Sequence, residues 1–311
     1  MVVKAGCAGY RYYRAPKGWK EQYEQKIQAY ADKFPLLELN STFYKLPRVS
    51  TAEKWKKLVE EVNDQFSFTV KANQRITHSP SSPTYDKANL DIPDEQEDKF
   101  GYFRPTQEVF DAWTETKEIC EALNVDICLF QTPASFRPTE GHLENLKHFF
   151  SQISGDFAFA FEPRGNEWKS VKLNETKQNL IRVMDHFMEK PSVTTGLAYF
   201  RLHGLGKRKH RYKFTNEDLL KLSETCKEHK GKVYVVFNNF EMFNDCQRFL
   251  HYEERGEITD VSWGAKAVVD TIAVDFPTTR EKILSKCGRW WVWVNPDKSI
   301  RVKEALTSVE K

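Results

Sequence analysis

Charged and polar side chains end several apolar runs of this 311-residue chain. Glu38 and Asn40 end one run, Glu162 ends a second, and Arg201 and His203 end a third. Residues two apart on a strand share a face, so Glu38 lies with Asn40 and Arg201 with His203. Carboxylates and imidazoles can transfer protons, whereas buried charges cost several kcal/mol each unless they pair. We therefore expect either a reactive site or a salt-bridged plug.

Residue type suggests a role for each member of this set. Glu38, Glu162 and His203 are the candidate catalytic acids and bases. The candidate substrate-binding residues are Asn40, Thr42, Tyr44, Lys71, His78, Gln131, Arg164, Trp168, Arg201, Asn238 and Asn239. Structural alternatives remain open, because Glu38 could simply pair with Lys71 or Arg201, the histidines could be structural, and the two asparagines could form a turn.

A run of positive charge follows the segment that ends at His203. The candidate phosphate- or anion-binding residues of this run are Lys207, Arg208, Lys209, Arg211 and Lys213. Lysine offers a point charge and arginine a bidentate fork to an anion. The alternative is a solvated surface loop. We expect an anionic small molecule or a nucleic acid as partner, and the sequence does not indicate a protein partner.

Alternating strand-like and helix-like segments must position these residues. Strand-like runs occur at residues 2–8, 36–39, 66–70, 127–131, 157–161, 180–184, 197–202 and 233–237, and helix-like runs at 19–34, 50–62, 106–123, 140–153, 215–229 and 240–252. Most strand-like runs are continuously apolar, as parallel strands covered on both faces should be. The pattern predicts an α/β fold, a (β/α)8 TIM-type barrel whose chemistry gathers at the carboxyl ends of the strands. An open doubly wound sheet is the alternative, but it needs a glycine-rich phosphate turn that this sequence lacks.

Two segments fall outside the alternation. Residues 79–105 hold four prolines and six acidic residues, which predicts a long loop and a candidate lid. Residues 257–311 follow the barrel of residues 1–256 and predict a small appended helix-plus-hairpin module, with a capping box at Thr278 and Glu281. The alternation of Trp291 and Trp293 favours a strand packed on the barrel, although aromatic and basic residues can also bind nucleic acid.

Composition excludes several classes of protein. Hydrophobic residues make up 40% of the chain and charged residues 29%, enough to form a sizeable core. No apolar run approaches the length of a membrane span, and Met1 leads directly into strand-like sequence without a signal peptide. Six widely spaced cysteines suit the reducing cytoplasm rather than a disulfide framework. The net charge of +3 does not by itself indicate nucleic acid.

Several segments carry a family resemblance. They are residues 37–47 (LELNSTFYKLP), 68–72 with Thr77-His78, 161–164 (FEPR) with Trp168, 199–204 (YFRLHG) and 235–239 (VVFNN). In this order they resemble the YecE-like family, domain of unknown function number seventy-two, over about residues 1–255. The resemblance implies a TIM-type barrel but no established reaction. The opening Gly6-Cys7-Ala8-Gly9-Tyr10 departs from the family's usual Gly-x-x-Gly-Trp.

Three functional hypotheses follow. The leading one is an enzyme, with a hydrolase as the candidate class, that uses acid–base chemistry at the barrel mouth on a phosphate-bearing substrate such as a nucleotide or nucleic acid. A metal-dependent phosphoesterase or nuclease is the second, with Glu38, His78, Glu162 and His203 as potential ligands. No cofactor and no metal residue is predicted outright, because Lys71 and Arg201 would repel a cation. The third is a non-catalytic protein that binds nucleic acid.

Overall fold

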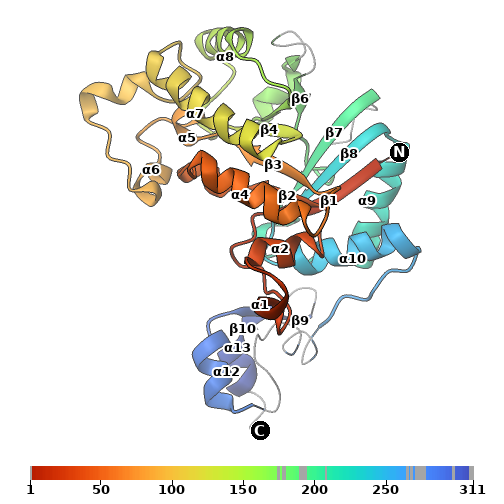
Figure 1. Ribbon diagram of the computed structural model, residues 1–311. Coiled ribbons are helices and arrows are strands. Elements are labelled where there is room, and N and C mark those ends of the chain that lie inside the picture. The colour runs from red at the N-terminus through yellow and green to blue at the C-terminus, as the bar shows by residue number, and fades with distance from the viewer. Residues whose placement is uncertain are drawn as a thin grey trace.

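Eight parallel strands form the centre of the computed structural model (Figure 1), which describes residues 2–173, 176, 180–188, 195–206, 209–263, 266, 269, 278–295 and 298–307. The strands are β1 Val2–Ala8, β2 Leu36–Leu39, β3 Ser67–Lys71, β4 Ile127–Gln131, β5 Ala158–Glu162, β6 Ile181–Arg182, β7 Thr195–Leu202 and β8 Lys230–Phe237. Their order is β6-β5-β4-β3-β2-β1-β8-β7. A parallel bridge between Met184 and Phe200 joins the two ends, where Arg201 N donates to Met184 O at 2.9 Å. The predicted barrel is therefore confirmed.

Helices cover the outside of the barrel (Figure 1). The longer ones are α2 Lys26–Ala31, α4 Val49–Glu60, α7 Gln107–Leu123, α8 Glu140–Gln152, α9 Asn216–Glu228 and α10 Met242–Arg255. The short ones are α1 Trp19–Gln22, α3 Ser41–Tyr44, α5 Gln74–Thr77 and α6 Pro83–Ala88, with 3₁₀ turns η1 Asp94–Lys99, η2 Asn166–Ser170 and η4 Lys209–Arg211. In the described residues, no helix has the length and apolarity needed to cross a membrane.

Several helix starts differ from the sequence prediction. The predicted helix at 19–34 is two helices, because Tyr23 has extended backbone with φ −131°. The Ser50–Glu53 capping box does not form, since α4 already begins at Val49. In α9, by contrast, Thr215 and Asp218 cap each other's backbone.

Apolar residues fill the barrel interior below its polar layer, on the side away from the carboxyl ends of the strands. This inner cluster comprises Leu36, Ile127, Leu129, Ala160, Val183, Tyr199, Tyr234 and Val236. Residues two further along the same strands point to the same face. Leu36 leads to Glu38, Leu129 to Gln131 and Ala160 to Glu162. The interior thus changes from an apolar layer to a polar one at the carboxyl ends of the strands.

The segment 79–105 is partly structured. It contains α6 and η1, and α6 projects to one side of the barrel (Figure 1). Its two ends are docked, because Tyr85 donates from its hydroxyl to His78 O at 3.0 Å and Phe103 is fully buried. Gly101 has φ 74°, and a Cβ there would lie 2.2 Å from His78 O, so this close approach requires glycine.

The C-terminal residues form the helix-plus-hairpin unit that the sequence predicts. It consists of α12 Arg280–Cys287, β9 Trp291–Asn295, β10 Lys298–Arg301 and α13 Val302–Thr307, with β9 and β10 antiparallel. Thr279, not Thr278, caps α12 by accepting from Lys282 N. Val292 faces the unit's own core with Cys287. Trp291 and Trp293, on the other face of β9, are half-buried.

Candidate functional site

Arg201 is the centre of the polar layer inside the barrel. Its Nε and Nη2 donate to the two oxygens of Glu38 at 2.9 and 2.7 Å, and its Nη1 donates to Glu162 Oε2. Nη1 also lies 3.2 Å from Gln131 Oε1. The side chains of Glu38 and Arg201 are 0% and 1% exposed. The sequence-predicted ion pair between Glu38 and Arg201 is therefore present, and it is bidentate.

Two hydroxyls that sequence reasoning missed complete this network. Tyr199 donates to Glu38 Oε2 at 2.6 Å, and Thr69 Oγ1 lies 2.9 Å from the Tyr199 hydroxyl. Tyr199 precedes Arg201 by two residues, and Thr69 precedes Lys71 by two. The strand alternation that paired Arg201 with His203 would also have found them. Glu38 has both oxygens engaged and is closed to solvent, so it holds Arg201 rather than offering a free base.

The charges of Arg201 and Glu162 stabilise each other. Burial alone would lower the pKa of Arg201, but Glu162 and Glu38 outweigh it and raise that pKa above its usual value. Burial alone would raise the pKa of Glu162, but Arg201, His203 and Arg164 together lower it. Both groups therefore stay charged at neutral pH. Arg164 Nη2 lies 3.6 Å from the second oxygen of Glu162.

Lys71 stands beside this pair at the end of β3. Its Nζ donates to Gln131 Oε1 at 3.1 Å and lies 3.9 Å from the centre of the Phe43 ring. Burial, followed by the positive charge of Arg201, lowers the pKa of Lys71 to about 7. The amine is thus close to half protonated at neutral pH, where an ordinary lysine is fully charged.

His78 is neutral in this environment. Burial, then the charges of Lys71 and Arg164, lower the pKa of His78 to about 3. Its ring packs edge-on against Phe43 at 4.8 Å, and Nδ1 contacts Thr77 Oγ1 at 2.8 Å. The sequence placed His78 at the mouth, and the structure brings it there as an uncharged ring.

His203 lies between two carboxylates. Nε2 is 3.5 Å from Glu162 Oε1, and Nδ1 is 3.5 Å from Asp185 Oδ2. The backbone N of His203 donates to the same Asp185 oxygen at 3.1 Å. Sequence reasoning missed Asp185, although it directly follows the predicted sixth strand, where the barrel rule would look for a polar residue.

Other candidates hold the barrel rim together. Thr42 Oγ1 lies 2.6 Å from Leu39 O and 2.7 Å from Lys71 O, so it ties β2 to β3. Trp168 is fully buried and donates from Nε1 to Phe136 O at 2.9 Å. Tyr44 is 36% exposed and packs edge-on against Phe43. Asn40 directly follows β2, and Asn238 donates from its backbone to Leu202 O at 2.8 Å.

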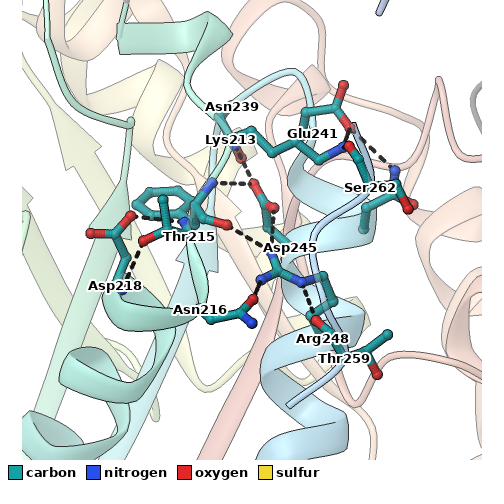
Figure 2. Close-up of polar contacts among 12 residues, drawn as sticks. Lys213, Thr215, Asn216, Asp218, Asn239, Glu241, Asp245, Arg248, Thr259 and Ser262 are labelled. Atoms are coloured by element: carbon teal, nitrogen blue, oxygen red, sulfur yellow. Dashed lines mark hydrogen bonds and ion pairs between the residues drawn. The ribbon is translucent and has the colours of Figure 1, made fainter. Parts of the chain in front are cut away.

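Asn239 belongs to a different network (Figure 2). Its Nδ2 donates to Asp245 Oδ2 at 2.7 Å and to Tyr212 O at 2.8 Å. Arg248 joins Asp245 at 3.4 Å and donates to Phe214 O and Thr259 O. This network fastens the loop before α9 and the chain after α10, so Asn239 does not join the cluster around Arg201.

Two residues of the basic run, Arg211 and Lys213, contact the C-terminal part of the chain. Lys213 is only 6% exposed, and it donates to Ser262 O at 3.0 Å and lies 3.8 Å from Glu241 Oε2 (Figure 2). The Arg211 guanidinium lies 4.1 Å from the Trp291 ring, and Lys209 Nζ lies 3.7 Å from Met188 Sδ. Lys207 and Arg208 lie outside the described residues.

The acidic side chains around Arg201 are engaged by cationic and hydroxyl partners. Within the part of the chain that the structure describes, no group of three His, Cys, Asp or Glu side chains is arranged to hold a metal ion. The oxygens of Glu38 are engaged by Arg201 and Tyr199, and those of Glu162 face Arg201, Arg164 and His203. This donor set does not suit a divalent cation. The six cysteines are free thiols, and all are buried.

Comparison with known proteins agrees with this architecture. UPF0759 protein YunF of Bacillus subtilis is 24% identical over 257 residues, covering 71% of this chain and 82% of that protein. The crystal structure of a DUF72 family protein, TM1631 of Thermotoga maritima, matches with TM-score 0.55 and 19% identity, covering 82% of this chain and all of the other. EF0366 of Enterococcus faecalis, also of that family, matches with TM-score 0.53 and 17% identity, covering 81% and 97%. The family described as "Protein of unknown function DUF72" matches residues 4–253, and the chain belongs to it.

Proposed function

We propose that this protein is an enzyme that binds a phosphate-bearing small molecule at the barrel mouth and uses Lys71 to transfer a proton. The observation that carries the proposal is the Lys71 amine at the end of β3, whose pKa is lowered to about 7. A proton-transferring group works best when its pKa lies near the working pH, and the active sites of barrels of this type lie at this end.

The charges available to a ligand favour an anion. Arg201 is saturated by Glu38 and Glu162, which leaves Lys71 and Arg164 as the cations that could meet a substrate. Both lower the pKa of His78, so both lie close to the same spot. A phosphate placed there would favour the charged form of Lys71 and accept hydrogen bonds from Arg164.

Unpartnered polar atoms support a ligand at the same place. Among the described residues, the buried side-chain atoms without a hydrogen-bond partner include Asn40 Oδ1, Thr132 Oγ1 and His203 Nε2, which directly follow β2, β4 and β7, and Arg164 Nε, two residues after β5. Buried polar atoms are nearly always satisfied in folded proteins. A polar ligand that reached these atoms would satisfy them.

The proposed proton transfers use two groups. Lys71, neutral in about half the molecules near pH 7, accepts a proton from the substrate. His203, placed between Glu162 and Asp185, supplies a proton to the substrate, so that one proton is removed and one is delivered, with the two carboxylates beside its ring. Glu38 takes no part in transfer and holds Arg201.

Turnover of a panel of sugar phosphates, nucleotides and phosphodiesters tests the proposal. We expect kcat/KM, which reports the free enzyme, to rise with pH through an apparent pKa of about 7, as Lys71 loses its proton. Lys71→Met should lower kcat by about 10²–10⁴-fold, the usual contribution of general acid–base catalysis, and His203→Ala should lower it in the same range. Lys54→Met is the matched control, because Lys54 is 53% exposed and pairs with Glu24 outside the barrel.

Three results would contradict the proposal. Full activity in both Lys71→Met and His203→Ala would remove these residues from the reaction. Activity that disappears with a chelator and returns with a divalent cation would indicate the metal-dependent alternative. Phosphate-dependent thermal stabilisation without turnover of any panel member would indicate a binding protein instead of an enzyme.

A further inference from the structure

A cavity of about 600 Å³ lies between the barrel and the C-terminal hairpin, separate from the cluster around Arg201. Its barrel side comes from the loop after β1 and the loop between β8 and α10, and its other side from β9 and the residue pair before it. Volumes of this size are typical of small-molecule sites. Nothing in the proposed reaction at the mouth uses this cavity.

Three arginines and three tryptophans contribute to its lining. The Arg14 guanidinium lies 3.5 Å from the Trp290 ring centre, and Arg211 lies 4.1 Å from that of Trp291. Trp291 also meets Arg301 at 4.4 Å, while Arg289 lines the cavity beside it. A guanidinium stacked on an indole keeps its in-plane N–H donors free for a second partner.

No ion pair within the described residues neutralises these arginines. In the described ranges, neither Arg14, Arg211 nor Arg289 forms an ion pair with a carboxylate, and Glu241 is the acidic residue among those that line the cavity. Burial lowers the pKa of Arg14 and outweighs the opposing effect of Glu241, which forms no ion pair with it in the described residues. Three guanidiniums in one hollow favour a doubly charged phosphate.

Two exposed aromatic rings stand at the same cavity. Phe240 is 63% exposed and Tyr12 is 75% exposed, although large aromatic rings are usually covered. The backbone of Phe240 is held firmly, because its N–H donates to His210 O at 2.7 Å. A flat apolar ring of a ligand could stack on these faces, as nucleic-acid bases do on aromatic side chains.

We propose that this cavity binds a nucleotide unit, with its phosphate on Arg14, Arg211 and Arg289 and its base stacked on Phe240 or Tyr12. The unit could be a free nucleotide or one residue of a single strand. The shared chemistry is an aromatic base joined to a phosphate. The site is independent of the proposed reaction at the barrel mouth.

Calorimetric titration of the full chain with AMP, with inorganic phosphate and with a short single-stranded oligonucleotide tests this proposal. Phe240→Ala should weaken AMP binding by about 5-fold or more, as loss of a stacking ring does, and leave phosphate binding unchanged. Arg14→Gln should weaken all three ligands by roughly tenfold, because it removes a charge-assisted hydrogen bond. Arg255→Gln is the matched control, since Arg255 is 64% exposed and lies on α10 away from the cavity lining.

The outcomes distinguish a free nucleotide from a single strand, and the cavity from the site at the barrel mouth. Tight binding of the oligonucleotide with weak binding of AMP supports a strand, and the reverse supports a free nucleotide. Binding that is unchanged in both Phe240→Ala and Arg14→Gln, or no binding by any of the three ligands, overturns the proposal. Lys71→Met should leave AMP binding at this cavity intact, so failure of the mouth as a reactive site would not affect this result. Circular dichroism of each variant establishes that the protein remains folded.

Discussion

Replacing Arg201 with methionine would remove the guanidinium that joins Glu38 to Glu162 inside the barrel. Both carboxylates would stay buried, since the Glu38 side chain is 0% and that of Glu162 10% exposed. Loss of one partner of a buried ion pair costs about 3–5 kcal/mol, mainly because the remaining charge is left unpaired. Unfolding entropy of about 2.1 cal/mol/K per residue gives roughly 0.65 kcal/mol/K for this chain, so the midpoint should fall by about 5–8 °C.

The stability lost in Arg201→Met should depend on pH. In the native protein the pKa of Glu162 is lowered by its cationic neighbours, so this contribution to stability is present above the unfolded pKa and declines as pH falls. Without Arg201, the effect of burial raises the pKa of Glu162, and protonation of Glu162 at low pH relieves its repulsion with Glu38. The deficit of Arg201→Met should therefore be largest near about pH 8 and smaller near about pH 5.

Urea denaturation at several pH values, followed by circular dichroism, measures this effect. Arg255→Met is the surface control, and we expect it to change the free energy of unfolding by less than about 0.5 kcal/mol. The triple variant Glu38→Gln, Arg201→Met, Glu162→Gln should regain part of the loss, because it leaves no unpaired charge. An Arg201→Met protein as stable as the wild type at every pH would refute the reasoning.

Two further outcomes follow from buried groups outside that cluster. Burial, and then the charge of Glu241, raise the pKa of Asp245 to about 7, so the folded protein binds a proton that the unfolded chain releases. The free energy of unfolding should therefore rise as pH falls through about 7. In urea titrations, Asp245→Asn should remove this dependence on pH. An unchanged slope in the variant would contradict this assignment. Gly6→Ala should cost about 1–3 kcal/mol, because its Cβ would lie 1.9 Å from Leu36 O between β1 and β2. Gly141→Ala in α8 is its control, since no atom lies within 4 Å of the added Cβ, and a calorimetric midpoint that falls equally in both variants would argue against the clash.

The candidate site was only partly predictable. Residue type and strand alternation indicated Glu38, Arg201 and His203, because the polar ends of parallel strands meet at one end of a barrel. Which partner each would choose was not predictable, since Glu38 could have paired with Lys71 or Arg201. Asp185 was missed although it directly follows the predicted sixth strand, where the same rule applies.

Local charge density was a poor guide to position. Arg211 and Lys213 form part of a run that suggested an anion site at the mouth, but they contact Trp291 and Ser262 near the C-terminal unit. Asn239 resembles a ligand-orienting residue at the end of β8, yet it donates to Asp245. The direction in which a loop side chain points depends on the elements that pack against it, and these lie far away in the sequence.

The order of the apolar runs was enough to predict the barrel from the sequence. Continuously apolar strands that alternate with amphipathic helices can bury their apolar faces in only a few folds. Tertiary structure alone decided the chemistry of the mouth. The lowered pKa of Lys71 arises from burial and from Arg201, 130 residues away on a strand across the barrel. The cavity beside Trp290 and Trp291 likewise exists only because the C-terminal hairpin folds back against the loops that follow β1 and β8.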